Sequence, residues 1–111
     1  PHVVQEISLV EGVPVIYSLG NYIFDQYFST EVQEGLVVKL HFDDEPFLSL
    51  IPVTSELVMS QPTMMSPEKH SDFLDKLAQK SHMSLRQDIK KGKISLNSIV
   101  ATSSKIAIMD Q

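Results

Sequence analysis

The sequence predicts an α+β fold in which β-hairpins, mostly antiparallel, are followed by helices. Residues 1–60 alternate apolar and polar side chains with the two-residue period of strands, and a helical period begins after Ser66. The composition is that of an ordinary globular protein, with 42% hydrophobic and 21% charged residues. We therefore expect a strand-rich part over residues 1–60 and a helical segment with a tail over residues 61–111 of the same domain.

The first expected hairpin covers residues 3–18. Its first strand runs from Val3 to Val10, and Glu11-Gly12 is a turn sequence after which Val13 to Ser18 resumes the extended pattern. The side chains expected on one face of the first strand are those of Val3, Gln5, Ile7 and Leu9.

A second hairpin is expected over residues 35–54, with a polar turn at residues 43–46. The apolar row of its first strand is Leu36, Val38, Leu40 and Phe42, and we expect the row to be half-buried. The connection between the two hairpins, residues 19–34, is long for a compact domain. Such loops are often functional.

Helix signals follow in the second half. Ser66-Pro67-Glu68 predicts a helix start with a serine cap, and the helix is expected to end near Lys80. Ser84 resembles the cap of a shorter helix, for which Gly92 is a plausible stop. The tail of residues 94–111 is ambiguous, because Ile106, Ile108 and their neighbours fit a final strand but serine and threonine interrupt the pattern.

The charge of the chain excludes a general attraction for nucleic acid or an anionic membrane, because the formal net charge is −5. It is unevenly distributed: residues 1–65 hold one basic and nine acidic residues, and residues 66–111 hold eight basic and five acidic ones. The two halves either attract one another, or the basic half meets a partner, or both are simply solvated surface.

No cysteine is present, so disulfides and thiolate metal sites are excluded. No apolar run reaches the roughly 20 residues that a membrane-spanning helix needs, and no signal peptide is recognisable. The sequence begins at Pro1-His2 without methionine, which indicates a start inside a longer protein.

The four histidines do not form a metal-binding pair by local spacing. His41 on a strand, His70 in a helix and His82 in a linker are expected to be packed or solvated. His2 differs, because it stands at the start of a strand, where side chains converge at the rim of an α/β sandwich. It is either a metal ligand or a structural residue.

The segment after Ser18 is built for a tight backbone path. Gly20 permits a positive φ, and Asn21 tolerates left-handed geometry. The polar side chains of Asn21, Asp25 and Gln26 either line a pocket or satisfy a buried turn. A nucleophile elbow at Ser18 is excluded, because Ile16 occupies the position that requires glycine.

Two stretches carry a family resemblance. Residues 1–5 read PHVVQ and residues 17–26 read YSLGNYIFDQ, which resemble the HPHVxQ and YSLGNFIFDQ motifs of the CapA family of bacterial capsule (poly-γ-glutamate) biosynthesis proteins. The intervening Glu11 to Ile16 fits the hairpin position of that family, and the Gly35-Leu36 pair and Pro52 fit its next strands. The resemblance is specific over residues 1–26 and fair to about residue 60.

The resemblance implies the C-terminal part of a β-sandwich like that of calcineurin-type metallophosphoesterases. It implies a divalent metal (Mn, Zn, Fe or Mg) in the intact protein, with His2 as a metal ligand and the other ligands upstream of this chain. It also implies Asn21 and Asp25 as pocket-lining catalytic candidates, and Gln5 and Gln26 as substrate-binding residues. This chain alone is expected to bind no metal tightly.

Two functions remain open at this point. The chain is either part of a metal-dependent hydrolase, or a non-catalytic subdomain that closes the sheet and handles polymer or protein contacts. The expected partners are the upstream part of the same protein and the capsule polymer. The resemblance implies an extracytoplasmic location at the bacterial cell surface. Open strand edges also predict that the chain self-associates.

Overall fold

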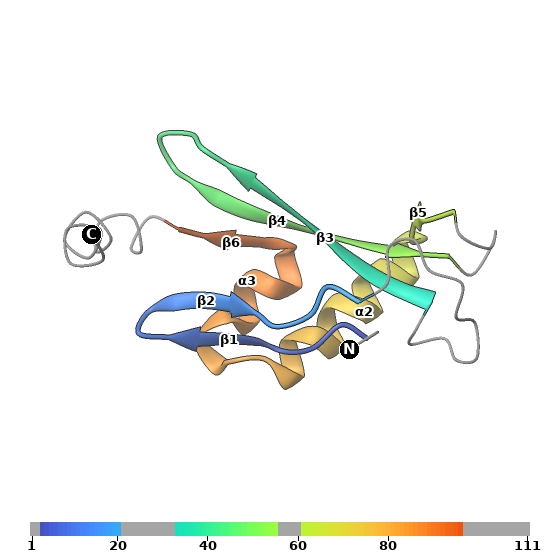
Figure 1. Ribbon diagram of the computed structural model, residues 1–111, viewed down its shortest axis with the longest axis horizontal. Helices are drawn as coiled ribbons and strands as arrows, with labels where there is room; N and C mark the ends of the chain where they lie inside the picture. Colours follow the sequence, from blue (N-terminus) through green and yellow to red (C-terminus); the bar gives the residue numbers. More distant parts are fainter. Residues whose placement is uncertain (1–2, 21–32, 56–60, 97–111) are drawn as a thin grey trace.

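The computed structural model describes residues 3–20, 33–55 and 61–96. These residues form a small α+β domain built from an antiparallel hairpin, a four-stranded antiparallel sheet and two α-helices (Figure 1). The α+β class and the antiparallel hairpins predicted from the sequence are confirmed. His2, Asn21, Asp25, Gln26 and the tail beyond residue 96 lie outside the described residues.

The first hairpin pairs β1 (Ile7–Val10) with β2 (Val13–Ile16). Its two-residue turn has positive φ at both positions, 51° at Glu11 and 80° at Gly12, which matches the twist of the flanking strands. The hairpin and its turn are confirmed, but both strands are shorter than predicted.

The predicted face of the first strand is wrong before Ile7. Val4 is buried whereas Val3 and Gln5 are only half-buried. Val4 forms an isolated bridge with Leu19. Because the two residues between Val4 and Ile7 lie outside the strand, the alternation changes phase between the bridge and β1.

The second hairpin pairs β3 (Glu34–His41) with β4 (Phe47–Thr54) along their whole lengths, as predicted. On its other side, β4 pairs with β5 (Thr63–Met64) at one end and with β6 (Lys93–Ser95) at the other. β6 follows directly on Gly92, the glycine after the last helix, and the final strand that the sequence left open around Ile106 and Ile108 lies outside the described residues.

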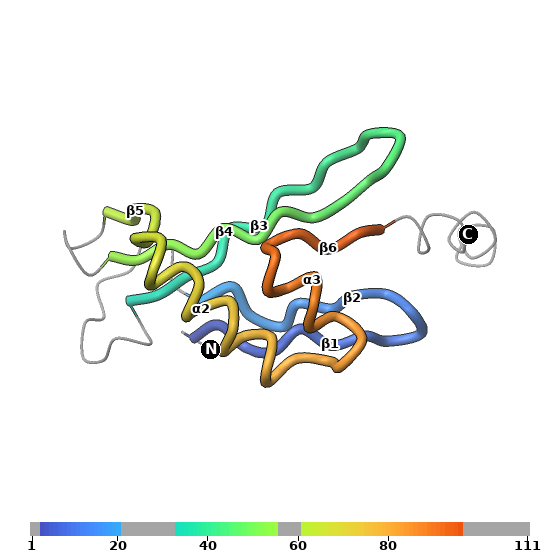
Figure 2. Tube along the Cα trace, turned by 180° about the vertical axis from the view of Figure 1, so that it is seen from behind, coloured from blue at the N-terminus to red at the C-terminus, as the bar shows by residue number. Residues whose placement is uncertain are grey.

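The apolar row of β3 is covered over only half of its length. Leu36 is 4% exposed, whereas Leu40 is 45% and Phe42 is 85% exposed. The expectation of a half-buried row is wrong for these last two residues, because the tip of the β3–β4 hairpin extends past the helices (Figure 1). Seen from behind, the tip is again clear of the rest of the chain (Figure 2).

The long helix α2 (Pro67–Lys80) begins and ends where the sequence predicts. The Ser66 hydroxyl accepts a hydrogen bond from the Lys69 amide at 3.4 Å, which caps the first turn. The buried face of α2 consists of Leu74, Leu77 and Ala78.

Two short helices follow, η1 (Met83–Leu85) and α3 (Arg86–Lys91). The predicted cap is wrong: Ser84 lies inside η1, and the His82 ring accepts a hydrogen bond from the Ser84 amide at 3.1 Å. The predicted stop is confirmed, since Gly92 ends α3 with a φ of 74°.

The core lies where α2 and α3 meet β1 on one side and the sheet on the other (Figure 1). Its most enclosed side chains are those of Ile7, Leu74, Leu77, Ile89 and Ile94. The Ile7 amide donates to the Ser81 hydroxyl at 2.9 Å, and the His82 amide donates to the Ile7 carbonyl at 2.9 Å. These two bonds fasten β1 to the end of α2.

Candidate functional site

Three segments far apart in the sequence meet at one rim of the domain. Val4 bridges Leu19, Gly20 bridges Gly35, and the Leu36 amide donates to the Leu19 carbonyl at 2.8 Å. Val4 and the Leu19-Gly20 pair therefore lie side by side, next to the start of β3. In the sequence, Val4 comes two residues after His2, and Gly20 directly precedes Asn21.

Gly20 is required at this meeting point for two reasons. Its φ is 73°, a conformation that other residues rarely adopt. A Cβ atom there would also lie 2.7 Å from the Glu34 carbonyl oxygen and 2.9 Å from a methyl carbon of Val4. The tight backbone path predicted for this segment is confirmed at Gly20.

Ser18 holds the same rim together. It is 8% exposed, and its hydroxyl donates to the Val3 carbonyl at 2.7 Å and accepts from the Gly20 amide at 3.2 Å. The Gln5 amide donates to the Ser18 carbonyl at 3.3 Å. A hydroxyl engaged in these two bonds positions backbone, which agrees with the exclusion of Ser18 as a nucleophile.

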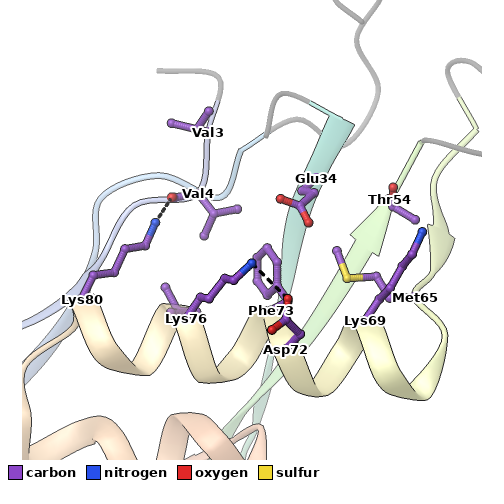
Figure 3. Close-up of a pocket in the computed structure, with 11 residues that line it drawn as sticks. Val3, Val4, Glu34, Thr54, Met65, Lys69, Asp72, Phe73, Lys76 and Lys80 are labelled. Atoms are coloured by element: carbon purple, nitrogen blue, oxygen red, sulfur yellow. Dashed lines mark hydrogen bonds and ion pairs between the residues drawn. The ribbon is translucent and has the colours of Figure 1, made fainter. Parts of the chain in front are cut away.

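A cavity of about 670 Å³ opens beside this rim, between α2 and the segments that carry Val4, Glu34 and Thr54 (Figure 3). Val3 and Val4 line it from the N-terminal segment, and Glu34 and Thr54 line it from β3 and β4. The residues that line it from α2 and the segment before it are Met65, Lys69, Asp72, Phe73, Lys76, Leu77 and Lys80.

Three lysines of α2 point toward this cavity (Figure 3). Lys69, Lys76 and Lys80 share a helix face because they are spaced by seven and by four residues. Lys80 donates from Nζ to the Val4 carbonyl at 2.8 Å, across 76 positions of sequence. Its ammonium group therefore binds the N-terminal segment to α2.

Lys76 forms an ion pair with Asp72, with 3.1 Å between Nζ and Oδ2. The hydrogen bond to Asp72 and the charge of that carboxylate raise the pKa of Lys76 above its usual 10.5, with a further contribution from the charge of Glu34. Both side chains of the pair are largely exposed, so the pair is screened by solvent. The cavity wall thus mixes ammonium and carboxylate groups.

The described residues hold no group of three or more histidine, aspartate or glutamate side chains that could bind a metal ion. Within residues 3–20, 33–55 and 61–96 the structure therefore offers no complete metal site. None of the helices in these ranges is long and apolar enough to cross a membrane.

The sequence-predicted site residues divide into two groups. Gln5 is half-buried in the N-terminal segment, where its amide bonds to Ser18, and it is not among the residues that line the cavity. His2, Asn21, Asp25 and Gln26 lie outside the described residues, so their predicted roles stay predictions.

The three other histidines differ in their surroundings. His41 accepts from or donates to the Ser49 hydroxyl at 2.9 Å, and its ring stacks on Phe47 with 4.1 Å between centroids. His82 caps η1, and His70 is half-buried in the first turns of α2. His41 and His82 thus have local structural contacts.

Sequence reasoning missed the lysines of the cavity. Their spacing on the predicted helix was the available signal, together with the basic character of the second half of the chain. The wall of the cavity that faces α2 could not be predicted from the sequence. It contains Val4 and Glu34, which are brought to the helix by pairing between distant segments.

Comparison with protein-family models, with curated proteins and with solved structures gives no match to this chain.

Proposed function

We propose that this chain is the C-terminal part of a CapA-type capsule (poly-γ-glutamate) biosynthesis protein and contributes one rim of a metal-dependent hydrolase site. The observation that carries the proposal is the meeting of Val4, Gly20 and Gly35. The described parts of the two stretches that resemble the family motifs, residues 3–5 and 17–20, meet at this rim.

The close contacts of Gly20 support this reading of the motif. A residue with a side chain would collide with the backbone of Glu34, so the glycine in Ser18-Leu19-Gly20-Asn21 has a geometric function. Gly20 allows the backbones around Val4, Gly20 and Gly35 to approach one another closely. A glycine with this function is suited to a motif that must keep a fixed position at the edge of the domain.

The metal in this proposal is a divalent ion such as Mn, Zn, Fe or Mg, held by His2 together with residues upstream of the chain. A bound divalent ion supplies activation of water and stabilisation of a developing oxyanion. Since the other ligands in this proposal lie upstream of the chain, we expect this chain alone to bind metal weakly. In the same proposal the chain forms the C-terminal part of a metallophosphoesterase-like β-sandwich. The protein is located outside the cytoplasm, at the bacterial cell surface.

Calorimetric titration with Mn²⁺ tests the proposal on two proteins, this chain and the product of the complete reading frame. We expect stoichiometric binding only by the longer protein, and loss of that binding with His2→Ala. His70→Ala is the matched control, because His70 is a half-buried histidine of α2. Unchanged metal binding in the His2→Ala variant would contradict the proposal, as would tight binding by this chain alone.

A second candidate is a non-catalytic, polymer-handling role, and the observation that favours it is the row of Lys69, Lys76 and Lys80 at the cavity. A polycarboxylate such as poly-γ-glutamate would meet these ammonium groups in the absence of metal. Fluorescence titration with poly-γ-glutamate at low and at high salt tests this role. Binding that weakens with salt and with Lys76→Met, but not with Lys90→Met on α3, would favour it over the enzyme.

A further inference from the structure

Among residues 3–20, 33–55 and 61–96, one edge of the four-stranded sheet lacks a backbone partner over part of its length. The Leu50 amide donates to the Gly92 carbonyl and so points away from β3. Since Val38 is opposite Leu50 and directly opposed residues share their bonding state, Val38 also points its backbone groups away from β4. Because the direction of the backbone groups alternates along a strand, those of Leu36 and Leu40 also point away from β4.

Of these three positions, the first alone is paired on its outer side with another described residue. Leu36 donates its amide to Leu19, whereas no backbone hydrogen bond within the described ranges reaches the outer groups of Val38 and Leu40. An unpaired edge of this kind is a template for another strand. The side chains along it are also exposed, 45% for Leu40 and 85% for Phe42.

The position of this edge leaves room for a large partner. The tip of the β3–β4 hairpin is clear of the helices from both sides (Figures 1 and 2). An added strand would therefore meet the hairpin without displacing α2 or α3.

Lys39 decides how two copies of this edge can pair. Hydrogen-bonded pairs must join residues whose backbone groups point outward. If Val38 faced Leu40 of a second copy, the two Lys39 side chains would stand directly opposite one another, which is unfavourable for like charges. If the two Leu40 residues face one another, Lys39 stands opposite His41 instead.

We propose that a second copy of this chain pairs antiparallel with β3, with Leu40 opposite Leu40 at the two-fold axis. In this register Val38 of the second copy lies opposite Phe42, the residue that directly follows β3, so an aromatic side chain that is 85% exposed gains an apolar neighbour. The two sheets join into one continuous sheet across the dimer.

Single cysteine variants test the register, because the chain contains no cysteine. Directly opposed residues in a hydrogen-bonded pair are about 5.5 Å apart between Cα atoms, which suits a disulfide. In the proposed register Leu40→Cys faces itself, whereas Lys39→Cys and its copy are diagonal neighbours about 7–8 Å apart. Non-reducing gels after mild oxidation measure covalent dimer formation, and circular dichroism verifies folding.

Val13→Cys is the control for random collision, because Val13 is similarly exposed, at 43%, on the other hairpin. We expect Leu40→Cys to crosslink about tenfold or more faster than both other variants, because a preformed pair raises the effective thiol concentration. Light scattering of the unmodified chain should give twice its mass of 12.5 kDa. Faster crosslinking of Lys39→Cys, equal rates for all three variants, or a clean monomer would each overturn the proposal.

Discussion

Replacing Gly20 by alanine is the sharpest test of the rim. The new Cβ would lie 2.7 Å from the Glu34 carbonyl oxygen and 2.9 Å from a methyl carbon of Val4, distances that real Cβ atoms essentially never show. Because the nearer atom belongs to the backbone, no side-chain rotation relieves the contact. The pairing of residues 4, 20 and 35 must shift.

The expected cost has two parts. The left-handed φ of 73° costs a residue with a side chain about 1–2 kcal/mol. Forcing a methyl group into a packed position adds about 1–3 kcal/mol. The free energy of unfolding should therefore fall by about 2–5 kcal/mol, a large share of the roughly 5–15 kcal/mol typical of a domain.

Gly12→Ala separates the two parts. Gly12 has a similar φ of 80°, but nothing lies within 4 Å of its Cβ position, so only the conformational cost applies. Urea unfolding followed by circular dichroism measures both variants against the unmodified chain. If Gly20→Ala is no less stable than Gly12→Ala, the close crossing does not exist as described.

Three further predictions concern single contacts. Ser81→Ala leaves the buried Ile7 amide without its acceptor and should lower the free energy of unfolding by about 1–3 kcal/mol in urea titrations. Ser66→Ala removes the cap of α2, and the same titration should show a loss of about 0.5–1 kcal/mol, because the capping bond is long and exposed. Asp72→Asn should lower the pKa of Lys76 toward 10.5, measured by NMR of the lysine side chain. Since the pKa is raised in the folded state, the ion pair stabilises the fold below pH 10.5, and that stabilisation is lost as the pH rises through the raised value; an unchanged pKa would refute the pairing.

The helix ends and the first turn were predicted correctly, because each is determined by residues that are neighbours in the sequence. Ser66 and Pro67 fix the start of α2, and Gly92 ends α3, because caps and left-handed stops depend on a few neighbouring residues. The turn at Glu11-Gly12 is of the same kind. Each of these features needs only the backbone within one or two turns.

The predictions that were wrong concern features that depend on segments distant in the sequence. Alternation predicts which side chains share a face of β3 but not how far the helices reach, so the exposure of Leu40 and Phe42 was missed. The capping role of His82 was missed because its backbone is placed by Ile7, 75 positions earlier. For the site, the sequence indicated the importance of Gly20 and contained the spacing of the lysines on α2, while the opposite wall at Val4 and Glu34 follows from tertiary pairing alone.

The bonds that fasten Ile7 to Ser81 and His82 also constrain the order of folding. During synthesis the first hairpin leaves the ribosome long before its anchoring residues exist as folded helix. Closing a loop of this length carries an entropic cost that only late contacts can offset, so the attachment of β1 to the end of α2 should be among the last events. Until α2 is complete, the amide and carbonyl of Ile7 remain bound to water, and the nascent chain depends on its hairpin turn alone to keep β1 and β2 together.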